Sequence, residues 1–213
     1  KREWRAVKSG AYSVWGTGWV YYGGDVLRGE SFADHVCRHL ESGNSLVQCL
    51  DRIDVNFAFI AWDGFQLYAA VDRVRSIPLT YRRDPCKFEI SDDVTLIASD
   101  SEELNEEATA ELALSGLVSG SLTIYSELSS LQSGEILFWK PGVFLKTQRY
   151  YEWLCEYDSG ETEEDLSSEY FKILEDVFRR FIAFLDGRQV VVALSAGLDS
   201  KLVVGMLRYF HYN

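Results

Sequence analysis

The chain has 213 residues, of which 47% are hydrophobic and 14% aromatic, and it contains only three prolines. This composition is typical of a globular protein with one large or two modest domains, and it excludes a long disordered chain. The net charge of −12 disfavours nucleic acid as a partner. No apolar run reaches membrane-spanning length and no signal-peptide core follows Lys1, so we expect a cytoplasmic protein with no membrane partner.

Negative charge is concentrated in two stretches. Residues 89–111 hold nine acids and no base, and residues 152–176 hold ten acids and one lysine. We interpret them as solvated faces and a linker rather than as a functional acidic patch. The cysteines lack the paired spacing of a zinc site, and we expect buried or free thiols at Cys37, Cys49, Cys86 and Cys155.

Residues 12–26 form the first strand-like region. They are rich in Trp, Tyr, Val and Gly, and the aromatic and β-branched residues favour strands. Because glycine commonly marks turns, we expect several short strands here, with turns at Gly16, Gly18 and the pair Gly23-Gly24.

Residues 31–50 have the apolar spacing of a helix that begins at the capping residue Ser31 and is interrupted near Gly43. His35 and His39 lie four residues apart and share a face, a spacing that can bind metal. No Glu or third ligand of a known zinc pattern follows. Solvated or capping histidines are therefore the preferred interpretation.

The central block predicts a hairpin and several shorter elements. Residues 56–63 have the composition of a strand, Gly64 turns the chain, and residues 66–71 are the expected hairpin partner. A loop over residues 72–81 leads into another strand, with Pro78 at its entry. Further elements are a short strand at 96–99, a helix over 105–117 that ends near Gly116 and Gly120, and two strands near 123–124 and 137–139 around Ser133-Gly134.

The last part of the chain predicts a long helix, a strand and a second helix. The first helix begins at Ser167 or Ser168 and ends at Gly187, with apolar residues at helical spacing. Residues 190–194 form an apolar, β-branched-rich run typical of a buried strand. The second helix continues through Leu202 and Leu207.

The segment between this strand and this helix has the properties of a phosphate site. A strand that breaks into a turn and then a helix presents unpaired backbone N–H groups at the positive end of the helix dipole. Small residues at Ser195, Ala196 and Gly197 let a phosphate approach the backbone. Asp199 would repel a bare phosphate but suits a Mg²⁺ that the phosphate shares. The alternative is an ordinary strand-turn-helix corner with a Ser or Asp cap.

The segment resembles the Ser-Gly-Gly-x-Asp-Ser pyrophosphate loop of the ATP pyrophosphatase (PP-loop) families, which include asparagine synthetase, β-lactam synthetase, argininosuccinate synthetase and GMP synthetase. Ala196 replaces the second Gly of that loop, and Lys201, interpreted as solvent-exposed, replaces a Ser. The resemblance implies MgATP as a cofactor, with Asp199 on the Mg²⁺. It places the pyrophosphate on Ser195, Ala196, Gly197, Leu198, Asp199 and Ser200.

The block before this loop resembles the N-terminal-nucleophile (Ntn) glutaminase domain of asparagine synthetase-type enzymes, the class II glutamine amidotransferases. That family carries, in order, Gly-Asp-Phe-Ala-Phe-Ala-x-Trp-Asp, Arg-Asp-Arg-x-Gly-x-x-Pro-Leu-Tyr-Tyr, Ala-Ser-Glu, Thr-Ile and Leu-Pro-Pro-Gly. The same order and spacing occur in this chain at Phe57-Ala58-Phe59, Trp62-Asp63, Asp72-Arg73, Pro78-Leu79, Tyr81, Ala98-Ser99-Asp100, Thr123-Ile124 and Leu131-Gln132-Ser133-Gly134.

The residues of glutaminase chemistry do not match. The nucleophile of that family is a Cys at the mature N-terminus, whose own α-amine serves as base. Residue 1 here is Lys, and the first cysteine, Cys37, lies inside a predicted helix. The glutamine-binding Arg segment is missing, and at residues 20–25 a Tyr occupies the position of the oxyanion-hole Asn. We therefore name no catalytic residue and expect a degenerate glutaminase site.

Together the resemblances imply a fold class. Residues 1–150 are expected to form an α+β Ntn-hydrolase-like sandwich of antiparallel sheets with helices, and residues 151–166 an acidic linker. Residues 167–213 are expected to be the first helix-strand-loop-helix of an α/β PP-loop domain. A doubly wound sheet needs several βα units, so we expect a truncated chain that does not catalyse ligation alone, in which Tyr212-Asn213 begins a next strand.

The implied function is that of an asparagine synthase-related ATP-dependent ligase. Such an enzyme adenylates a carboxylate, releases pyrophosphate and forms an amide with an amine or ammonia. The expected partners are a small-molecule carboxylate and an amine, with a homo-oligomer possible. The alternative is a non-catalytic Ntn-like module for assembly or partner binding. A tRNA-modifying PP-loop enzyme is a third reading, which the acidity and the Ntn-like block disfavour.

Overall fold

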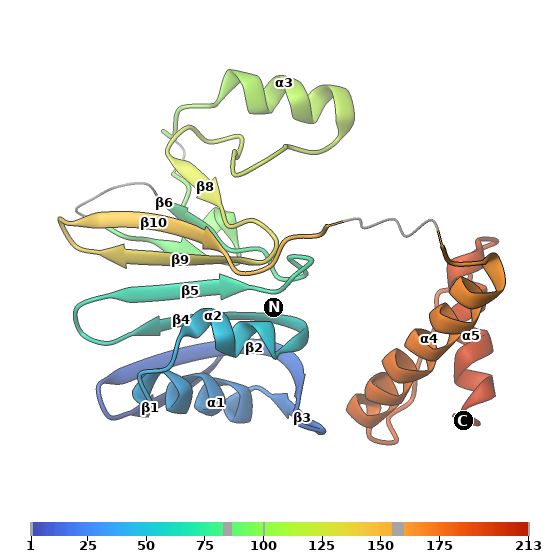
Figure 1. Ribbon diagram of the computed structural model, residues 1–213. Helices are drawn as coiled ribbons and strands as arrows, with labels where there is room; N and C mark the ends of the chain where they lie inside the picture. The colour runs from blue at the N-terminus through green and yellow to red at the C-terminus, as the bar shows by residue number, and fades with distance from the viewer. Residues whose placement is uncertain (1, 83–86, 100, 155–159, 213) are drawn as a thin grey trace. The chain divides into compact units, whose positions relative to one another are not determined.

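The structure is a computed structural model that describes residues 2–82, 87–99, 101–154 and 160–212. The chain divides into two compact units, Lys1–Trp153 and Leu154–Asn213 (Figure 1). Four residues on which the sequence interpretation partly depends, Cys86, Asp100, Cys155 and Asn213, lie outside the described residues.

The first unit is a mixed α+β structure with antiparallel sheets. Its large sheet has seven strands in the order β1-β2-β4-β5-β9-β10, and β3 shares with β1 the edge of β2 that faces away from β4. Its small sheet has the order β7-β6-β8. The strands are β1 (Arg5–Ser9), β2 (Tyr12–Tyr22), β3 (Asp25–Arg28), β4 (Asp54–Trp62), β5 (Leu67–Val71), β6 (Thr80–Arg82), β7 (Ile90–Ser91), β8 (Leu128–Ser130), β9 (Glu135–Lys140) and β10 (Phe144–Arg149).

The predicted hairpin of β4 and β5 is confirmed, with Ala58 opposite Val71. Because successive side chains of a strand point to opposite faces, Phe57 and Phe59 lie in one hydrophobic cluster and Ala58 in another. Both faces of β4 are therefore covered. This explains why its sequence is almost continuously apolar rather than alternating with polar residues.

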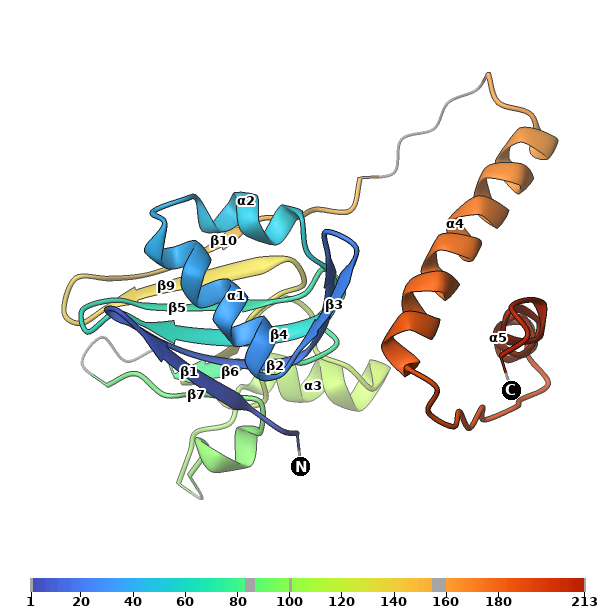
Figure 2. The same cartoon turned by 90° about the horizontal axis from the view of Figure 1, so that it is seen from below.

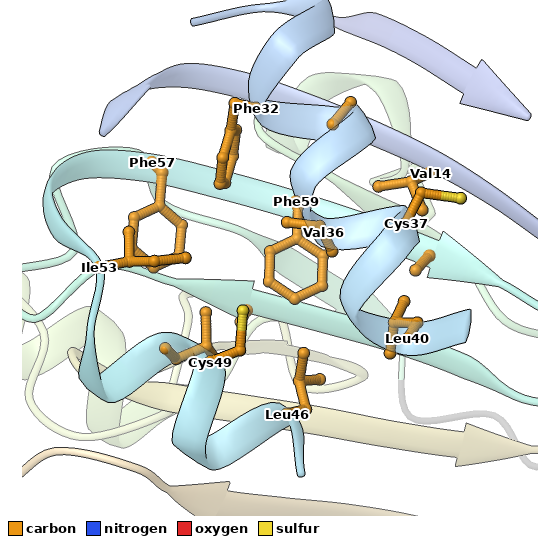
Figure 3. Close-up of a cluster of buried hydrophobic side chains, with 14 of the residues drawn as sticks. Val14, Phe32, Val36, Cys37, Leu40, Leu46, Cys49, Ile53, Phe57 and Phe59 are labelled. Carbon is orange, nitrogen blue, oxygen red and sulfur yellow. The ribbon is translucent and has the colours of Figure 1, made fainter. Parts of the chain in front are cut away.

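Two helices, α1 (Glu30–Glu41) and α2 (Leu46–Asp51), cover one face of the large sheet (Figures 1 and 2). Phe32 of α1 is fully buried, and its ring centroid lies 5.5 Å from that of Phe57 (Figure 3). Burying a side chain of this size contributes about 1.5–3 kcal/mol. The expected break near Gly43 is confirmed, since its φ of 70° ends α1.

The predicted capping role of Ser31 is wrong. The N-cap of α1 is Gly29, and Ser31 lies in the first turn of the helix. Its hydroxyl accepts a hydrogen bond from the backbone N–H of Arg28 and donates one to the Arg28 carbonyl, each at 3.0 Å. The Ser31 side chain therefore stabilises the chain segment before α1 from two positions after the N-cap residue.

Gly16 and Gly18 do not form turns, as the sequence had suggested, but lie inside the single eleven-residue strand β2. A Cβ on Gly16 would come within 3.1 Å of the Phe32 ring, so this glycine lets α1 pack closely on the strand. Gly18 has φ 90°, and a Cβ there would lie 2.1 Å from the Asn56 carbonyl oxygen. The glycines serve close approach rather than chain reversal.

The other face of the large sheet carries the small sheet and the connections around it (Figure 2). The predicted helix at 105–117 is confirmed as α3 (Glu106–Ser115), with the Asn105 side chain as its cap and Gly116 in the left-handed region at its end. The predicted strand at 96–99 is wrong. A short 3-10 helix spans Val94–Leu96 instead, because Asp93 accepts the backbone N–H of Thr95 and starts a turn.

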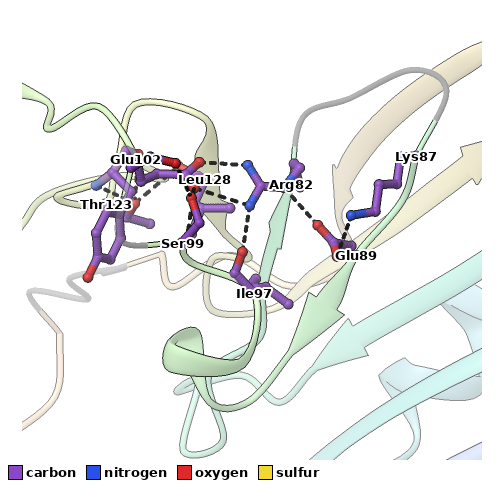
Figure 4. A network of polar contacts seen from close by, with 10 residues as sticks. Arg82, Lys87, Glu89, Ile97, Ser99, Glu102, Thr123 and Leu128 are labelled. Atoms are coloured by element: carbon purple, nitrogen blue, oxygen red, sulfur yellow. Dashed lines mark hydrogen bonds and ion pairs between the residues drawn. The ribbon is translucent and has the colours of Figure 1, made fainter.

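Arg82, at the end of β6, links the small sheet to the chain segments that follow it. Its guanidinium donates to Glu89 at 2.8 Å and to Glu102 at 2.6 Å, and it also donates to the Ile97 carbonyl (Figure 4). The Glu102 side chain is only 5% exposed. These hydrogen bonds hold the acidic stretch of the chain against β6, although the sequence had suggested only a solvated face.

The second unit contains two helices among its described residues, α4 (Glu163–Leu185) and α5 (Leu198–Tyr209). Helix α4 begins earlier than expected, inside the predicted linker, because Thr162 and Asp165 form a reciprocal capping box. It ends at Asp186, which adopts φ 52° before Gly187. Phe178 and Leu185 of α4 pack with Met206 and Leu207 of α5.

Candidate functional site

The predicted phosphate site lies at the N-terminus of α5. Gly197 is the N-cap residue, with φ −70° and ψ 161°, and no side chain caps the helix. The first N–H groups of a helix have no intrahelical partner, and here no capping oxygen covers them. Residues 195–199 are exposed and Ser200 is half-buried. The positive end of the α5 dipole is therefore open to a ligand.

Two serine side chains give the turn its shape. The Ser200 hydroxyl accepts the backbone N–H of Ser195 at 3.1 Å and lies 3.0 Å from the Ser195 hydroxyl oxygen. The Ser195 hydroxyl in turn accepts the backbone N–H of Gly197 at 3.2 Å. The turn thus brings two hydroxyl groups and a short run of backbone amides together, a set of donors suited to phosphate oxygens.

Asp199 lies in the first turn of α5 and is exposed. Among the described residues, no group of three or more His, Cys, Asp or Glu side chains forms a metal cage. A single carboxylate suits Mg²⁺ that is bound mainly through phosphate oxygens and water. The donor set at this turn therefore fits a magnesium-bound phosphate and does not fit a metal ion held by protein alone. Lys201 is exposed, as expected.

The strand predicted at residues 190–194 is not formed. These residues have no regular secondary structure, and the described part of the second unit contains no strand. A β-strand requires hydrogen bonds from a neighbouring strand, and nothing described here supplies them. Val190 and Val192 nevertheless contact the core of α4 and α5, and the Tyr212 hydroxyl donates to the Arg188 carbonyl at 2.6 Å. The turn is therefore positioned by two helices.

The first unit places its described thiols away from any reactive position. Cys37 is fully buried on α1, and burial raises the pKa of its thiol. Cys49 is 3% exposed, and burial raises the pKa of its thiol to about 11. A protonated, buried thiol is a poor nucleophile. Residues 20–25, where the sequence had a Tyr in the oxyanion-hole position, are the end of β2, the Gly23-Gly24 turn and the start of β3.

His35 and His39 do not come together at a metal site. The His39 Nε2 atom lies 3.0 Å from the Ser45 carbonyl oxygen, which fits the expected capping role. The His35 ring packs against Tyr22 at 4.3 Å between centroids, and burial lowers the pKa of this histidine. Each histidine serves local packing.

Asp72, one of the residues that carry the family resemblance, organises a buried turn. It is 1% exposed, and its carboxylate accepts the backbone N–H groups of Phe57, Val74 and Ser76 at 2.9–3.2 Å, together with the Ser76 hydroxyl. The Asp72 carbonyl accepts the N–H of Gly134 at 3.0 Å. The structure thus brings together three segments of the resemblance, and Asp72 has a structural role there.

Arg75 is a residue that the sequence interpretation missed. It occupies the Gly position of the family pattern Arg-Asp-Arg-x-Gly-x-x-Pro-Leu and adopts φ 54°, in the left-handed region that favours glycine. The signal was visible in the sequence as a large charged residue at a glycine position. Its meaning depends on the cavity that it lines, which only the tertiary structure forms.

Comparison with known proteins gives distant structural similarity and no sequence match. No protein-family model matches the sequence, and no curated protein is similar to it. A solved structure of glutamine phosphoribosylpyrophosphate (PRPP) amidotransferase from B. subtilis, complexed with ADP and GMP, is similar to the chain with a TM-score of 0.40 and 12% identity. The similarity covers 68% of this chain and 30% of that chain. A likeness this low identifies neither family nor activity. Separately, no helix among the described residues is long and apolar enough to cross a membrane.

Proposed function

We propose that residues 195–200 bind the pyrophosphate portion of MgATP and that the protein is an ATP-dependent ligase that forms an amide from a carboxylate and an amine or ammonia. The observation that carries the proposal is the open N-terminus of α5, where the Ser195 and Ser200 hydroxyls lie 3.0 Å apart beside an uncapped helix end. An ordinary helix start would direct such a hydroxyl to its own N–H groups.

The chemistry of this turn favours a leaving pyrophosphate. Backbone N–H groups and the helix dipole stabilise negative charge that accumulates when the bond to the α-phosphate breaks. Asp199 would hold the magnesium ion that accompanies the phosphates. The two serine hydroxyls would donate to phosphate oxygens once their mutual contact opens. The carboxylate and amine substrates would bind outside this turn.

The first unit has a supporting role in this proposal. Cys37 and Cys49 are buried on the helix side of the large sheet, and neither is placed for attack on glutamine. Glutaminase chemistry needs an exposed, activated nucleophile with a base beside it. We therefore propose that these thiols do not hydrolyse glutamine and that the amine or ammonia comes from another source.

The test is a calorimetric titration of the protein with magnesium pyrophosphate and with MgATP, each repeated with EDTA in place of Mg²⁺. The wild-type protein should bind both ligands, and more tightly when Mg²⁺ is present. Asp199→Asn should weaken the binding at least tenfold with Mg²⁺. The same substitution should leave the metal-free affinity unchanged or raise it, because it removes a negative charge that repels phosphate.

Glu169→Gln is the matched control, because Glu169 is an exposed acid of α4 in the same unit and the substitution changes the charge equally. If Asp199→Asn and Glu169→Gln weaken binding to the same extent, the loss of affinity comes from the change in net charge. That result would contradict the role of Asp199. A wild-type protein that binds neither ligand contradicts the proposal as a whole. That result would favour a non-catalytic module, for which the buried thiols of the first unit are the supporting observation.

A further inference from the structure

We propose that a cavity in the first unit binds a small organic carboxylate with an apolar body, and that Arg75 holds the carboxylate group. The cavity has a volume of about 320 Å³. This is at the small end of the range of roughly 300–1,000 Å³ that ligand sites occupy. It belongs to a different unit from residues 195–200, so the inference does not depend on the proposed function.

The cavity combines one cation with a lining of both apolar and hydroxyl-bearing side chains. Arg75 is the charged residue of its lining, and Val94, Val118 and Leu122 form much of its apolar surface. All four are half-buried. A ligand that fills such a space needs one negative group for the guanidinium and an apolar remainder for the walls.

Most N–H donors of the Arg75 guanidinium have no acceptor among the described residues. Within the described parts of the chain it makes no ion pair, and its hydrogen bond is a long one, from Nη1 to the Ser130 hydroxyl oxygen at 3.5 Å. A guanidinium carries five N–H donors in a planar fork that matches a carboxylate. The contrast with Arg82 is informative, because that neighbouring arginine is saturated by Glu89 and Glu102 (Figure 4).

The backbone of Arg75 supports a role for its side chain. Its φ of 54° is unfavourable for a residue with a Cβ, at a cost of about 1–2 kcal/mol. The turn is held in this conformation by hydrogen bonds from Val74 and Ser76 to Asp72. Glycine would suit the position better on backbone grounds alone. The fixed turn therefore keeps the Arg75 side chain at the cavity that it lines.

Other residues that line the cavity are held by hydrogen bonds within the protein. The Ser130 N–H donates to the Ser121 carbonyl at 2.9 Å, and the Asn105 N–H donates to the Ile124 carbonyl at 2.9 Å. The Thr123 hydroxyl donates to the Tyr125 carbonyl at 2.9 Å. A wall fixed in this way needs little ordering on binding.

A carboxylate fits this cavity better than a phosphate does. A single arginine neutralises one negative charge by a bidentate contact, and the Ser130 hydroxyl is beside it as a further donor. A phosphate group carries up to two charges, and Arg75 would neutralise only one of them, because the described residues that line the cavity include no other cation. The apolar walls add affinity for an aliphatic or aromatic body.

The experiment compares isovalerate with isovaleramide, its neutral isostere, by calorimetry and by NMR shift mapping on the whole chain. Isovalerate should bind with a dissociation constant of about 1 mM or tighter and shift the amides of Arg75 and Ser130. Isovaleramide should bind at least tenfold more weakly, and inorganic phosphate should not compete. Equal binding of the acid and the amide would overturn the proposal, as would displacement of isovalerate by phosphate.

Two variants separate binding from folding. Arg75→Gly should abolish isovalerate binding while the melting temperature stays the same or rises, because glycine suits the backbone conformation. Val118→Trp should fill the cavity and also abolish binding with Arg75 intact. Arg149→Gln removes an equal charge at an exposed site on β10 and should leave binding unchanged. Isovalerate binding that survives Arg75→Gly, or that Arg149→Gln reduces equally, would refute the assignment.

Discussion

The hydroxyl oxygens of Ser195 and Ser200 lie 3.0 Å apart across the turn that precedes α5. Ser200 is in the first turn of the helix, and its oxygen also accepts the backbone N–H of Ser195 at 3.1 Å. These two contacts give the turn a defined shape. A site that is already organised loses less conformational entropy when it binds.

Ser200→Ala should weaken the binding of magnesium pyrophosphate by about tenfold, because it removes both a phosphate donor and the oxygen that holds the Ser195 N–H. Ser200→Thr retains the hydroxyl and should bind within about threefold of wild type. The measurement is the calorimetric titration already described. Ser167→Ala, at an exposed position of α4, is the control and should change nothing. Equal affinities for the Ser200→Ala and Ser200→Thr proteins would contradict the role of the hydroxyl.

Asp72→Ala should destabilise the first unit by about 3–5 kcal/mol, because it leaves buried N–H groups of Phe57 and Ser76 without an acceptor. All six tryptophans lie in this unit, so tryptophan fluorescence in urea follows its unfolding. Asp25→Ala, at an exposed position at the start of β3, should stay within about 0.5 kcal/mol of wild type. A small effect of Asp72→Ala would mean that water satisfies the turn.

Gly18→Ala should destabilise the large sheet by more than about 3 kcal/mol, because the new Cβ would lie 2.1 Å from the Asn56 carbonyl oxygen. Gly24 has a similar positive φ, 98°, but nothing lies within 4 Å of a Cβ placed there. Gly24→Ala should therefore cost only the backbone strain, about 1–2 kcal/mol. The difference between the two unfolding free energies in urea isolates the steric part, and equal values would argue against close β2–β4 contact at this position.

The ionisation of Glu102 should make the stability of the first unit depend on pH in the acidic range. Hydrogen bonds from Arg82 lower the pKa of Glu102 to about 2, below its value of about 4.3 in an unfolded chain. A lowered folded-state pKa gives stability that is fully present above the unfolded pKa and is lost as pH falls through the folded one. We therefore expect the Arg82–Glu102 contribution to disappear between about pH 4.5 and pH 2.

Glu102→Gln tests this expectation. The variant should be less stable than wild type at pH 7, and the difference should shrink as the pH falls from about 4.5 toward 2. Urea titrations at pH 7, 4 and 2.5, followed by tryptophan fluorescence, supply the three differences. Glu106→Gln, which removes an exposed carboxylate of α3, is the control for the change in charge. A constant difference across the series would exclude Glu102 as the titrating group.

The thiols of Cys37 and Cys49 should be nearly unreactive in the folded protein. Burial raises the pKa of Cys49 to about 11, so at pH 8 only about one thiol in a thousand is ionised. Iodoacetamide labelling of a Cys86→Ser/Cys155→Ser protein at pH 8 should be at least 100-fold slower than in urea. Rapid labelling of Cys37 in the folded protein would show an accessible thiolate and make Cys37 a candidate nucleophile.

Local patterns in the sequence predicted elements whose signals are contained within a few residues. The helix expected over residues 105–117 forms as α3 and ends at Gly116, and Gly64 turns β4 into β5 as expected. The amphipathic spacing predicted α4 and α5. In these cases capping, turn formation and helical periodicity act over one or two turns of chain, so the information is local.

Other features required the folded chain. Gly16 and Gly18 look like turn residues, but they allow α1 and β4 to approach β2 closely. Residues 190–194 have the composition of a strand, but they form none, because the described part of the second unit offers no strand to pair with. A strand is defined by hydrogen bonds to a partner that is remote in sequence, and its own residues do not encode whether that partner is present.

The sequence by itself determined the turn at residues 195–200, because a helix start with small residues and hydroxyls is a local arrangement. Only the tertiary structure decided what Asp72 and Arg75 do. Asp72 accepts a hydrogen bond from Phe57, which lies fifteen residues away in the sequence. Arg75 donates one to Ser130, which lies fifty-five residues away. The physical reason is that burial, and with it the cost of an unsatisfied charge, arises only when distant segments exclude water together.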